Sequence, residues 1–339
     1  MTAVHNSGLL RAMKSAVVLM FLVACSSSHG TGGDDTGVDA PGSTGDGAQP
    51  DAPHGVKTVF VIPLENKADA AIYGNTTSAP YINGLIGTWA SATNFKDELP
   101  TQDSEPHYVW MEAGTNVFAD HTFNTDNDAS ASNSTNSTAH LVTGLTAAGI
   151  PWTAYQEGIT THTCPIGSTG NYAAKHDPFV FFQDVVGSPP STSIASCASH
   201  HKAYADLPAD LAAGTVSGYV FITPDLCHDM HGALNCASGI TSTPNIKAGD
   251  TWLSTELPRI LAYAQAHDGV VFLTWDEGDS TNLIPFIALG THVKPGTTAT
   301  MYTHSSMIKT IDELLGAPVL ASVTSATDFA DMFQPGTLP

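Results

Sequence analysis

The sequence predicts an α/β fold in which helices cover both faces of a mostly parallel central sheet. From residue 56 onward, short apolar stretches of strand length alternate with amphipathic stretches of helical length. Strands separated by helical stretches indicate parallel strands joined by helical crossovers. The chain has 339 residues, 42% of them hydrophobic. This is enough to bury a full core in one large or two ordinary domains.

The expected elements follow one another without a long internal repeat. Each expected strand contains a nearly continuous run of apolar residues. In order, these segments are VKTVFVIPLEN (56–66), PWTAYQEG (151–158), GYVFITPDLCHDMH (218–231), GVVFLTWDEGD (269–279) and IPFIALG (284–290). The helices share apolar residues at helical spacing and are APYINGLIGTWA (79–90), AHLVTGLTAAG (139–149), GDTWLSTELPRILAYAQAH (249–267) and HSSMIKTIDELLG (304–316).

The N-terminus carries an export signal. Two basic residues precede an apolar run that is too short to span a bilayer and closes on LVAC at residues 22–25. This ending resembles a bacterial lipobox, which predicts cleavage of a signal peptide (1–24) and acylation of Cys25. An uncut secretory peptide with an incidental cysteine is the alternative. We therefore expect an exported bacterial lipoprotein, held by a lipid anchor at the cell surface or in the periplasm.

Composition changes sharply after the lipobox. Residues 26–54 contain no Leu, Ile or aromatic residue and are dominated by Gly, Ser, Asp and Pro. Such a segment cannot bury enough apolar surface to offset the entropy of ordering. Residues 25–54 are therefore expected to form a flexible tether, and residues 55–339 a single catalytic domain.

Four cysteines follow Cys25, namely Cys164, Cys197, Cys227 and Cys236. An even number in an exported chain predicts two disulfides, for which three pairings exist. We favour Cys164 with Cys197 and Cys227 with Cys236. No C-x-x-C spacing occurs, which argues against a structural zinc site.

The charge balance excludes one class of partner. The chain has 11 Lys and Arg against 32 Asp and Glu, a formal net charge of -21. Nucleic-acid binding needs clustered cations to neutralise phosphates, so a nucleic-acid partner is not expected.

Three of the expected strands end in residues that bind metals or transfer protons. These residues are Glu65 and Asn66, then Asp225, His228, Asp229 and His231, and finally Asp276 and Glu277. Ligands of open α/β sheets bind beyond the carboxyl ends of the strands, so these side chains are expected at one edge. Carboxylates gathered there would repel one another unless a divalent cation lay between them. The alternative is that acidic residues merely mark exposed loop starts.

The usual hydrolase signatures G-x-S-x-G, H-E-x-x-H and G-x-x-x-x-G-K-[ST] are missing from the chain. A hydroxyl-rich loop precedes a predicted helix in LPTQDSEPHYVWMEAGT (99–115). A hydroxyl at a helix N-terminus can coordinate a metal and attack phosphorus, and Ser104 is placed for this role. Thr101 is the competing nucleophile, and either residue could instead be only the helix cap.

Several blocks of the chain resemble the bacterial phosphoesterase family, and they occur in that family's order. The blocks are VIPLENKADAAIYGNTTSAPYINGL, WTAYQEG, AKHDPFVFF, ITPDLCHDMH, GDTWLSTELPRIL, VVFLTWDEGD and YTHSSMIKTIDELLG. The resemblance extends from residue 57 to about residue 320. The family contains acid phosphatases and phosphatidylcholine-type phospholipases C and belongs to the alkaline-phosphatase-like superfamily.

This resemblance implies a three-layer α/β/α fold and hydrolysis of a phosphate ester through a covalent phosphoserine at a metal centre. The implied metal ligands are Glu65, Asn66, Ser104, Asp276 and Glu277, with zinc, calcium and magnesium as candidate ions. The Asn66 amide would also bind a substrate oxygen. Asp279 is expected to be a solvated neighbour.

Ser104 corresponds to the hydroxyl of the family stretch P-S-x-P-N-Y. This chain departs from that stretch twice, with Asp103 where Pro is usual and His107 where Asn is usual. The position of His107 implies substrate binding. Four further residues match positions expected to surround the phosphate or protonate the leaving group: His176, Asp229, His231 and His304.

The expected partner is a phosphate-ester substrate, with a phospholipid or its head group as a candidate. The competing function is a non-catalytic surface lipoprotein that uses the acidic edge to bind cations or a ligand. Loss of phosphate-monoester hydrolysis on adding a chelator separates the two functions.

Overall fold

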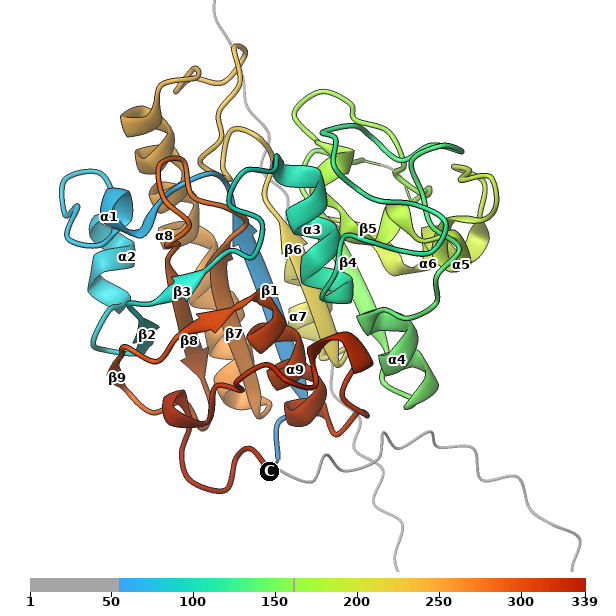
Figure 1. Cartoon of the computed structure of the whole chain (residues 1–339). Coiled ribbons are helices and arrows are strands. Elements are labelled where there is room, and N and C mark those ends of the chain that lie inside the picture. The colour runs from blue at the N-terminus through green and yellow to red at the C-terminus, as the bar shows by residue number, and fades with distance from the viewer. Residues whose placement is uncertain (1–54, 161) are drawn as a thin grey trace, which may run out of the picture. The chain divides into compact units, whose positions relative to one another are not determined.

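The computed structural model describes residues 55–160 and 162–339, and its main sheet has eight strands in the order β5-β4-β6-β1-β7-β8-β2-β9 (Figure 1). These strands are β1 (Thr58–Leu64), β2 (Ala90–Ala92), β4 (Trp152–Gln156), β5 (His201–Ala203), β6 (Tyr219–Thr223), β7 (Gly269–Trp275), β8 (Phe286–Gly290) and β9 (Gly296–Thr298). A separate parallel pair joins β3 (Phe95–Lys96) to β10 (Tyr302–Thr303). Strands β5, β4, β6, β1 and β7 run parallel, whereas β8 is antiparallel to β7 and β2.

Helices cover both faces of this sheet. On one face α3 (Ser104–Ala113) packs against α4 (Leu141–Ala147) and α9 (His304–Leu315), and α9 contacts β1 (Figure 1). On the other face α8 (Ser242–Ala266) lies on β7 and contacts α2 (Pro80–Leu85) and α7 (Leu207–Ala213). The predicted three-layer α/β/α fold is therefore confirmed.

Shorter helical segments complete the described part of the chain. They are α1 (Asp69–Ile72), α5 (Gln183–Val186), α6 (Ala195–His200), and the 3-10 turns η1 (Ala174–His176), η2 (Pro178–Phe181), η3 (Tyr204–Asp206), η4 (Ala321–Val323) and η5 (Ala330–Met332).

The central pair of strands sets the position of the site. Every residue of β1 and β7 is buried, as their nearly continuous apolar sequences require, and the two strands pair residue for residue to Leu64 and Trp275. Pairing of β1 with β6 ends earlier, at Val61. Pro63, which has no backbone N–H, lies beyond that point, where β6 no longer pairs with β1. The residues that follow β1 and β7 therefore emerge side by side.

Two of the expected helices have different limits. The segment 79–90 is helical only as α2, because Ile86 is extended and Gly87 has a φ of 79°, and the chain then enters the sheet as β2. Helix α8 begins at Ser242, before the expected start at residue 249. The short strands β2, β5 and β9 were not expected.

Both favoured disulfides are present, Cys164 with Cys197 and Cys227 with Cys236. Among the residues that the structure describes, no helix is both long and apolar enough to cross a membrane. The predicted signal peptide, the lipid-bearing Cys25 and the tether lie outside the described residues.

Candidate active site

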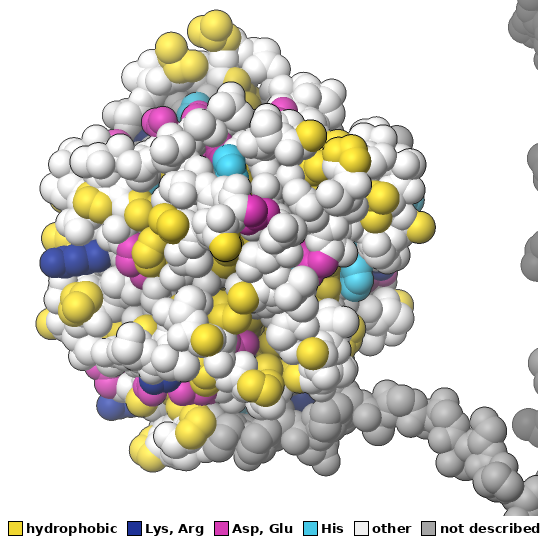
Figure 2. Space-filling model, turned by 45° about the vertical axis from the view of Figure 1, so that its right-hand side comes forward, with side chains coloured by type: hydrophobic (Ala, Val, Ile, Leu, Met, Phe, Trp, Pro, Cys, Tyr) yellow, Lys and Arg dark blue, Asp and Glu magenta, His cyan; other side chains and the backbone are white. Residues whose placement is uncertain are grey.

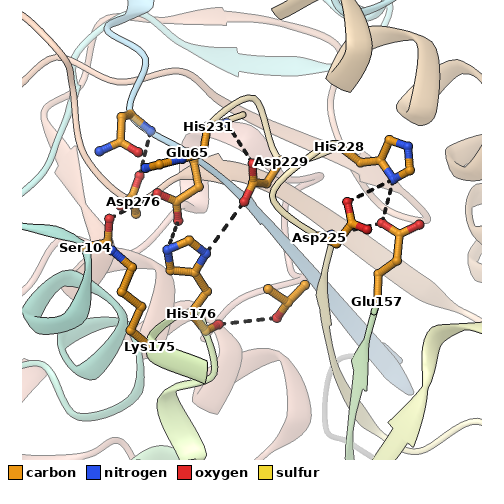
Figure 3. A network of polar contacts seen from close by, with 12 residues as sticks. Glu65, Ser104, Glu157, Lys175, His176, Asp225, His228, Asp229, His231 and Asp276 are labelled. Carbon is orange, nitrogen blue, oxygen red and sulfur yellow. Dashed lines mark hydrogen bonds and ion pairs between the residues drawn. The ribbon is translucent and has the colours of Figure 1, made fainter. Parts of the chain in front are cut away.

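The carboxyl ends of neighbouring parallel strands bring the predicted acidic residues together. Glu65 follows β1, Asp276 follows β7, and Asp229 lies in the loop after β6 (Figure 3). All three side chains are fully buried. The Glu65 N–H donates to the Asp229 carbonyl (2.7 Å) and the Asp276 N–H donates to the Leu64 carbonyl (3.0 Å), so backbone bonds hold the three strand ends together.

Ser104 is the first residue of α3 and points at Glu65 (Figure 3). Its Oγ donates a hydrogen bond to Glu65 Oε2 (3.1 Å), and one turn later the hydroxyl of Tyr108 donates to Glu65 Oε1 (2.6 Å). The Ser104 side chain is buried, whereas Thr101 is exposed in the preceding turn. Asp103 occupies the N-cap position, so neither hydroxyl residue is the N-cap residue.

Asn66 joins the ends of β1 and β7. Its backbone N–H donates to Asp276 Oδ1 (3.0 Å) and its side-chain Nδ2 donates to Glu277 Oε1 (2.8 Å). This requires a φ of 35°, a left-handed conformation that Asn tolerates better than most residues. The two bonds turn Asn66 Oδ1 away from Glu277 and leave it buried without a hydrogen-bond partner.

His176, Asp229 and His231 lie on the β6 side of Glu65. His176 places Nε2 3.4 Å from Glu65 Oε1 and Nδ1 3.6 Å from Asp229 Oδ2, and its ring stacks on Tyr108. The His231 N–H donates to Asp229 Oδ1 (2.7 Å). Glu65, His176 and Asp229 form a group whose ligand atoms all lie within 4.8 Å of one another.

His107 and His304 occupy different surroundings. The imidazole of His107 is buried beside Asp276 and Glu277, and with them it forms a second group of ligand atoms within 4.8 Å. His304 Nε2 bonds to the Trp275 carbonyl (2.9 Å), and its Nδ1 lies 3.6 Å from Glu98 Oε2. The polar contacts of the His304 ring are thus with Trp275 and Glu98.

Burial and mutual repulsion perturb the acids of the site. Burial, with Glu65 and Glu277 nearby, raises the pKa of Asp276 well above its usual range. Burial raises the pKa of Glu277 to about 7 and that of Asp229 to about 6. Burial also opposes ionisation of Glu65, but His176, His231 and the Tyr108 hydroxyl outweigh it and lower the pKa of Glu65.

Several buried polar atoms at this edge have no hydrogen-bond partner within the described part of the chain. They are Asn66 Oδ1, His107 Nε2, His176 Nε2, Asp229 Oδ2 and Asp276 Oδ2. A buried polar atom left unpaired costs about 1–3 kcal/mol, and most proteins avoid this cost. Carboxylate, amide and imidazole atoms are all metal ligands, so the set fits a divalent cation.

Asp225 and His228 do not join Glu65 as the strand-end pattern suggested. They form a separate, half-buried group with Glu157, which follows β4 (Figure 3). His228 Nδ1 lies 2.9 Å from Glu157 Oε2 and 3.3 Å from Asp225 Oδ1. The loop after β6 therefore divides its polar residues between two groups, with Asp229 and His231 at the main site. Glu157 also directly follows a strand, but it was not among the predicted site residues.

Lys175 is a second residue that the sequence reasoning missed. It precedes His176 in η1 (Figure 3). It pairs with Asp126, and its positive charge helps to lower the pKa of Glu65. Its side chain is mostly buried. The feature of the sequence that could have pointed to Lys175 was its position next to the predicted site residue His176 in AKHDPF.

The phosphoesterase family model matches residues 100–318, more than half of the chain. The chain belongs to the phosphoesterase family. This membership makes it a phosphoric ester hydrolase. A relative in Mycobacterium tuberculosis, named phosphatidylinositol-3-phosphatase, is 30% identical over 278 residues, covering 81% of this phosphoesterase and 82% of the relative. The phosphate-repressible acid phosphatase of Penicillium chrysogenum is 28% identical over 184 residues, covering 50% of this chain and 40% of the fungal one.

Solved structures share the fold of this phosphoesterase. A protein of the alkaline phosphatase superfamily from Vibrio parahaemolyticus aligns with a TM-score of 0.54 at 12% identity, covering 83% of this chain and 72% of that one. The phosphonate monoester hydrolase of Silicibacter pomeroyi aligns with a TM-score of 0.52 at 12% identity, covering 82% and 76%. These alignments show that the chain has the same fold as these proteins.

Proposed function

We propose that this phosphoesterase hydrolyses phosphate monoesters through a covalent phosphoserine at Ser104. The observation that carries the proposal is the hydrogen bond from the Ser104 hydroxyl to Glu65 at the N-terminus of α3. A nucleophilic hydroxyl needs an adjacent group that accepts its proton, and here that group is fixed by β1 and by Tyr108. The N-terminus of a helix also favours the anionic phosphoryl group.

The reaction has two steps. In the first, Ser104 Oγ forms a bond to phosphorus, its proton passes to Glu65 Oε2, and the ester P–O bond breaks to release the alcohol. In the second, water gives a proton to His231 and attacks the phosphoserine, the Ser104–phosphate bond breaks, and inorganic phosphate leaves. Ser104 recovers its proton from Glu65, so the residue ends as it began.

Residues on the β6 side of Glu65 supply the proton for the leaving group. Asp229 accepts a hydrogen bond from the backbone N–H of His231 and lies 3.6 Å from His176 Nδ1, so it positions the His231 backbone and the His176 imidazole. We assign His231 as the group that protonates the departing alcohol and His176 as a phosphate contact, with Lys175 adding positive charge. His304, which contacts the backbone just before Asp276, would act by positioning that strand end.

Glu65, Asn66, Ser104, Asp276 and Glu277 would hold a divalent cation. Ser104 bonds to Glu65, Asn66 bonds to Asp276 and Glu277, and Asn66 Oδ1 and Asp276 Oδ2 are buried without partners among the described residues. When bound, such a cation lowers the pKa of a coordinated hydroxyl and neutralises charge on phosphoryl oxygens. The Asn66 amide and the α3 N-terminus then orient the substrate.

A phosphorylated lipid head group is the proposed natural substrate. The relative named phosphatidylinositol-3-phosphatase covers most of this chain, and the predicted lipid on Cys25 would hold the enzyme at a membrane surface. The proposed location is the cell surface or the periplasm. The two disulfides are consistent with an oxidising compartment.

Hydrolysis of a chromogenic phosphate monoester by the full-length protein tests the proposed function. We expect turnover that disappears with a chelator and returns when a divalent cation is added. Turnover that persists after exhaustive chelation would show that hydrolysis does not depend on a metal ion. A folded protein that binds cations but hydrolyses no phosphate ester would favour the non-catalytic alternative.

A further inference from the structure

The imidazole of His107 is oriented like that of a metal ligand. Its Nδ1 lies 2.9 Å from the carbonyl oxygen of Asp103, one turn earlier in the chain, and an N–H must donate in that contact. A neutral imidazole with its proton on Nδ1 presents a bare lone pair at Nε2. Metal-binding histidines are commonly fixed in this way by a bond from the other ring nitrogen.

The imidazole of His107 is buried at the acidic edge. His107 is 1% exposed, and its Nε2 has no hydrogen-bond partner among the described residues. The ligand atoms of His107, Asp276 and Glu277 lie within 4.8 Å of one another, and Asp276 Oδ2 is also buried and unpaired. A lone pair and two carboxylates that face one another repel. One cation between them would satisfy both orphaned atoms.

We infer that His107 Nε2 coordinates the catalytic cation together with Asp276 and Glu277. The inference rests on the proposed metal-dependent function and adds a nitrogen to a ligand set that is otherwise made of oxygen atoms. Imidazole suits zinc and iron, whereas carboxylate, carbonyl and water oxygens suit magnesium and calcium. The centre of this chain therefore selects a zinc-class cation over calcium or magnesium. The oxygen-only set, with Asn at position 107, lacks that preference.

The competing arrangement is an imidazolium held by carboxylates alone. Asp97 is buried beside His107, and its Oδ1 lies 3.7 Å from Nε2. That separation is longer than a hydrogen bond, so Asp97 does not satisfy the nitrogen. In this arrangement the positive charge of protonated His107 would offset the negative carboxylates in place of a cation. Substitution of His107 would then leave metal selectivity unchanged.

The test measures zinc and calcium affinities of the full-length protein by competition with a chromogenic chelator, for wild type and His107→Asn. We expect zinc affinity to fall by roughly tenfold or more while calcium affinity holds or rises, because an amide oxygen replaces the imidazole nitrogen. His267→Asn is the matched control, since His267 is exposed at the end of α8 and its ring bonds to the Tyr263 carbonyl and stacks on the Tyr263 ring. Equal losses of zinc and calcium affinity in His107→Asn would overturn the selectivity claim.

A spectroscopic readout identifies the ligand directly. In the manganese-loaded wild type, electron spin echo modulation is expected to show an imidazole ¹⁴N coupling that His107→Asn loses and His267→Asn keeps. His107→Gln provides a second variant if the Asn variant fails to fold. Persistence of the coupling in either folded variant, or its absence from the metal-loaded wild type, overturns the assignment of His107 but leaves the proposed function standing. A wild type that binds no cation would instead contradict the proposed function itself.

Discussion

Ser104 and Thr101 lie three residues apart in one hydroxyl-rich loop, yet only Ser104 is turned into the acidic edge. Because Ser104 is buried against Glu65 and Thr101 is exposed, the two substitutions are expected to differ sharply. Ser104→Ala should lower kcat for a chromogenic phosphate monoester by roughly 10³-fold or more, since covalent catalysis disappears. Thr101→Ala should retain most of its activity. Comparable losses in the two variants would show that the loop matters only through its structure.

Substitution of Asp276 tests whether the site binds a metal ion through this carboxylate. Asp276→Asn keeps the size of the side chain but removes one negative charge from a fully buried acidic group. We expect cation content, measured by mass spectrometry of the purified protein, and phosphatase activity to be lost together. In chelator, the variant should be at least as stable to urea as wild type, because repulsion with Glu65 and Glu277 is relieved. Unchanged metal content and turnover would remove Asp276 from the ligand set.

Site residues that directly follow a strand could be predicted from the sequence. Polar residues directly after β1 and β7 could be selected because the ends of parallel strands meet at one edge, and Glu65 and Asp276 do meet there. The sequence was less informative inside the loops. The loop after β6 turns Asp225 towards Glu157 and Asp229 towards His176, a division that no spacing rule predicts.

At the scale of the elements, α3 carries Ser104, the proposed nucleophile, and is held in place by buried contacts at its far end. Glu112 of α3 lies 2.7 Å from His140 Nδ1, at the start of α4, and His140 Nε2 lies 3.0 Å from Asp184 of α5. Burial opposes charging of His140, but the two carboxylates outweigh it and raise its pKa to about 9. This group of three residues ties α3, α4 and α5 together.

Substitution of His140 should therefore destabilise the protein in a pH-dependent way. His140→Gln leaves Glu112 buried without its cation, so the free energy of unfolding in urea should fall by roughly 3–5 kcal/mol below about pH 6.5. Because the folded pKa is raised, the stabilisation by His140 is complete below its unfolded pKa and is lost as the pH rises through about 9. The deficit of the variant should shrink over that range. A deficit that does not vary with pH would mean that His140 acts by packing alone.

Long elements were easier to predict than short ones. The apolar stretches of β1, β6 and β7 and the helices α8 and α9 are strongly patterned. Each is present as expected, although α8 begins earlier, at Ser242. Strands β2 and β9 have only three residues each and owe their existence to pairing with β8 and with each other. Such short segments carry no pattern of their own, because tertiary contacts decide their conformation. The same effect shortened the helix expected over residues 79–90.

At the scale of the whole molecule, a strongly acidic chain acts on an anionic substrate. The net charge is -21, and on the face seen in Figure 2 acidic side chains are scattered singly among apolar and uncharged groups, without a broad basic patch. Under the proposed function, attraction of the phosphate would be local, through Lys175, the histidines and the proposed cation. The negative net charge does not attract an anionic substrate. Attachment to a membrane would offset this by raising the local concentration of a lipid substrate.

The predicted lipid anchor has its own test. Cys25→Ser should produce a protein that is no longer labelled by palmitate and no longer fractionates with membranes, because several acyl chains hold firmly where weak surface contacts do not. Activity on a soluble phosphate monoester should be unaffected, since Cys25 lies outside the proposed active site. If the variant remains in the membrane fraction, the anchor lies elsewhere in the chain.

The central claim is a covalent phosphoserine at Ser104, and trapping that intermediate tests it most directly. The full-length protein is mixed with a labelled phosphate monoester, quenched in acid, digested, and its phosphopeptides are mapped by mass spectrometry. The account predicts one phosphate on the peptide that contains Ser104, and none in Ser104→Ala. A phosphate on Thr101, or no adduct in an enzyme that still turns over under conditions where breakdown of the intermediate is slow, would contradict it.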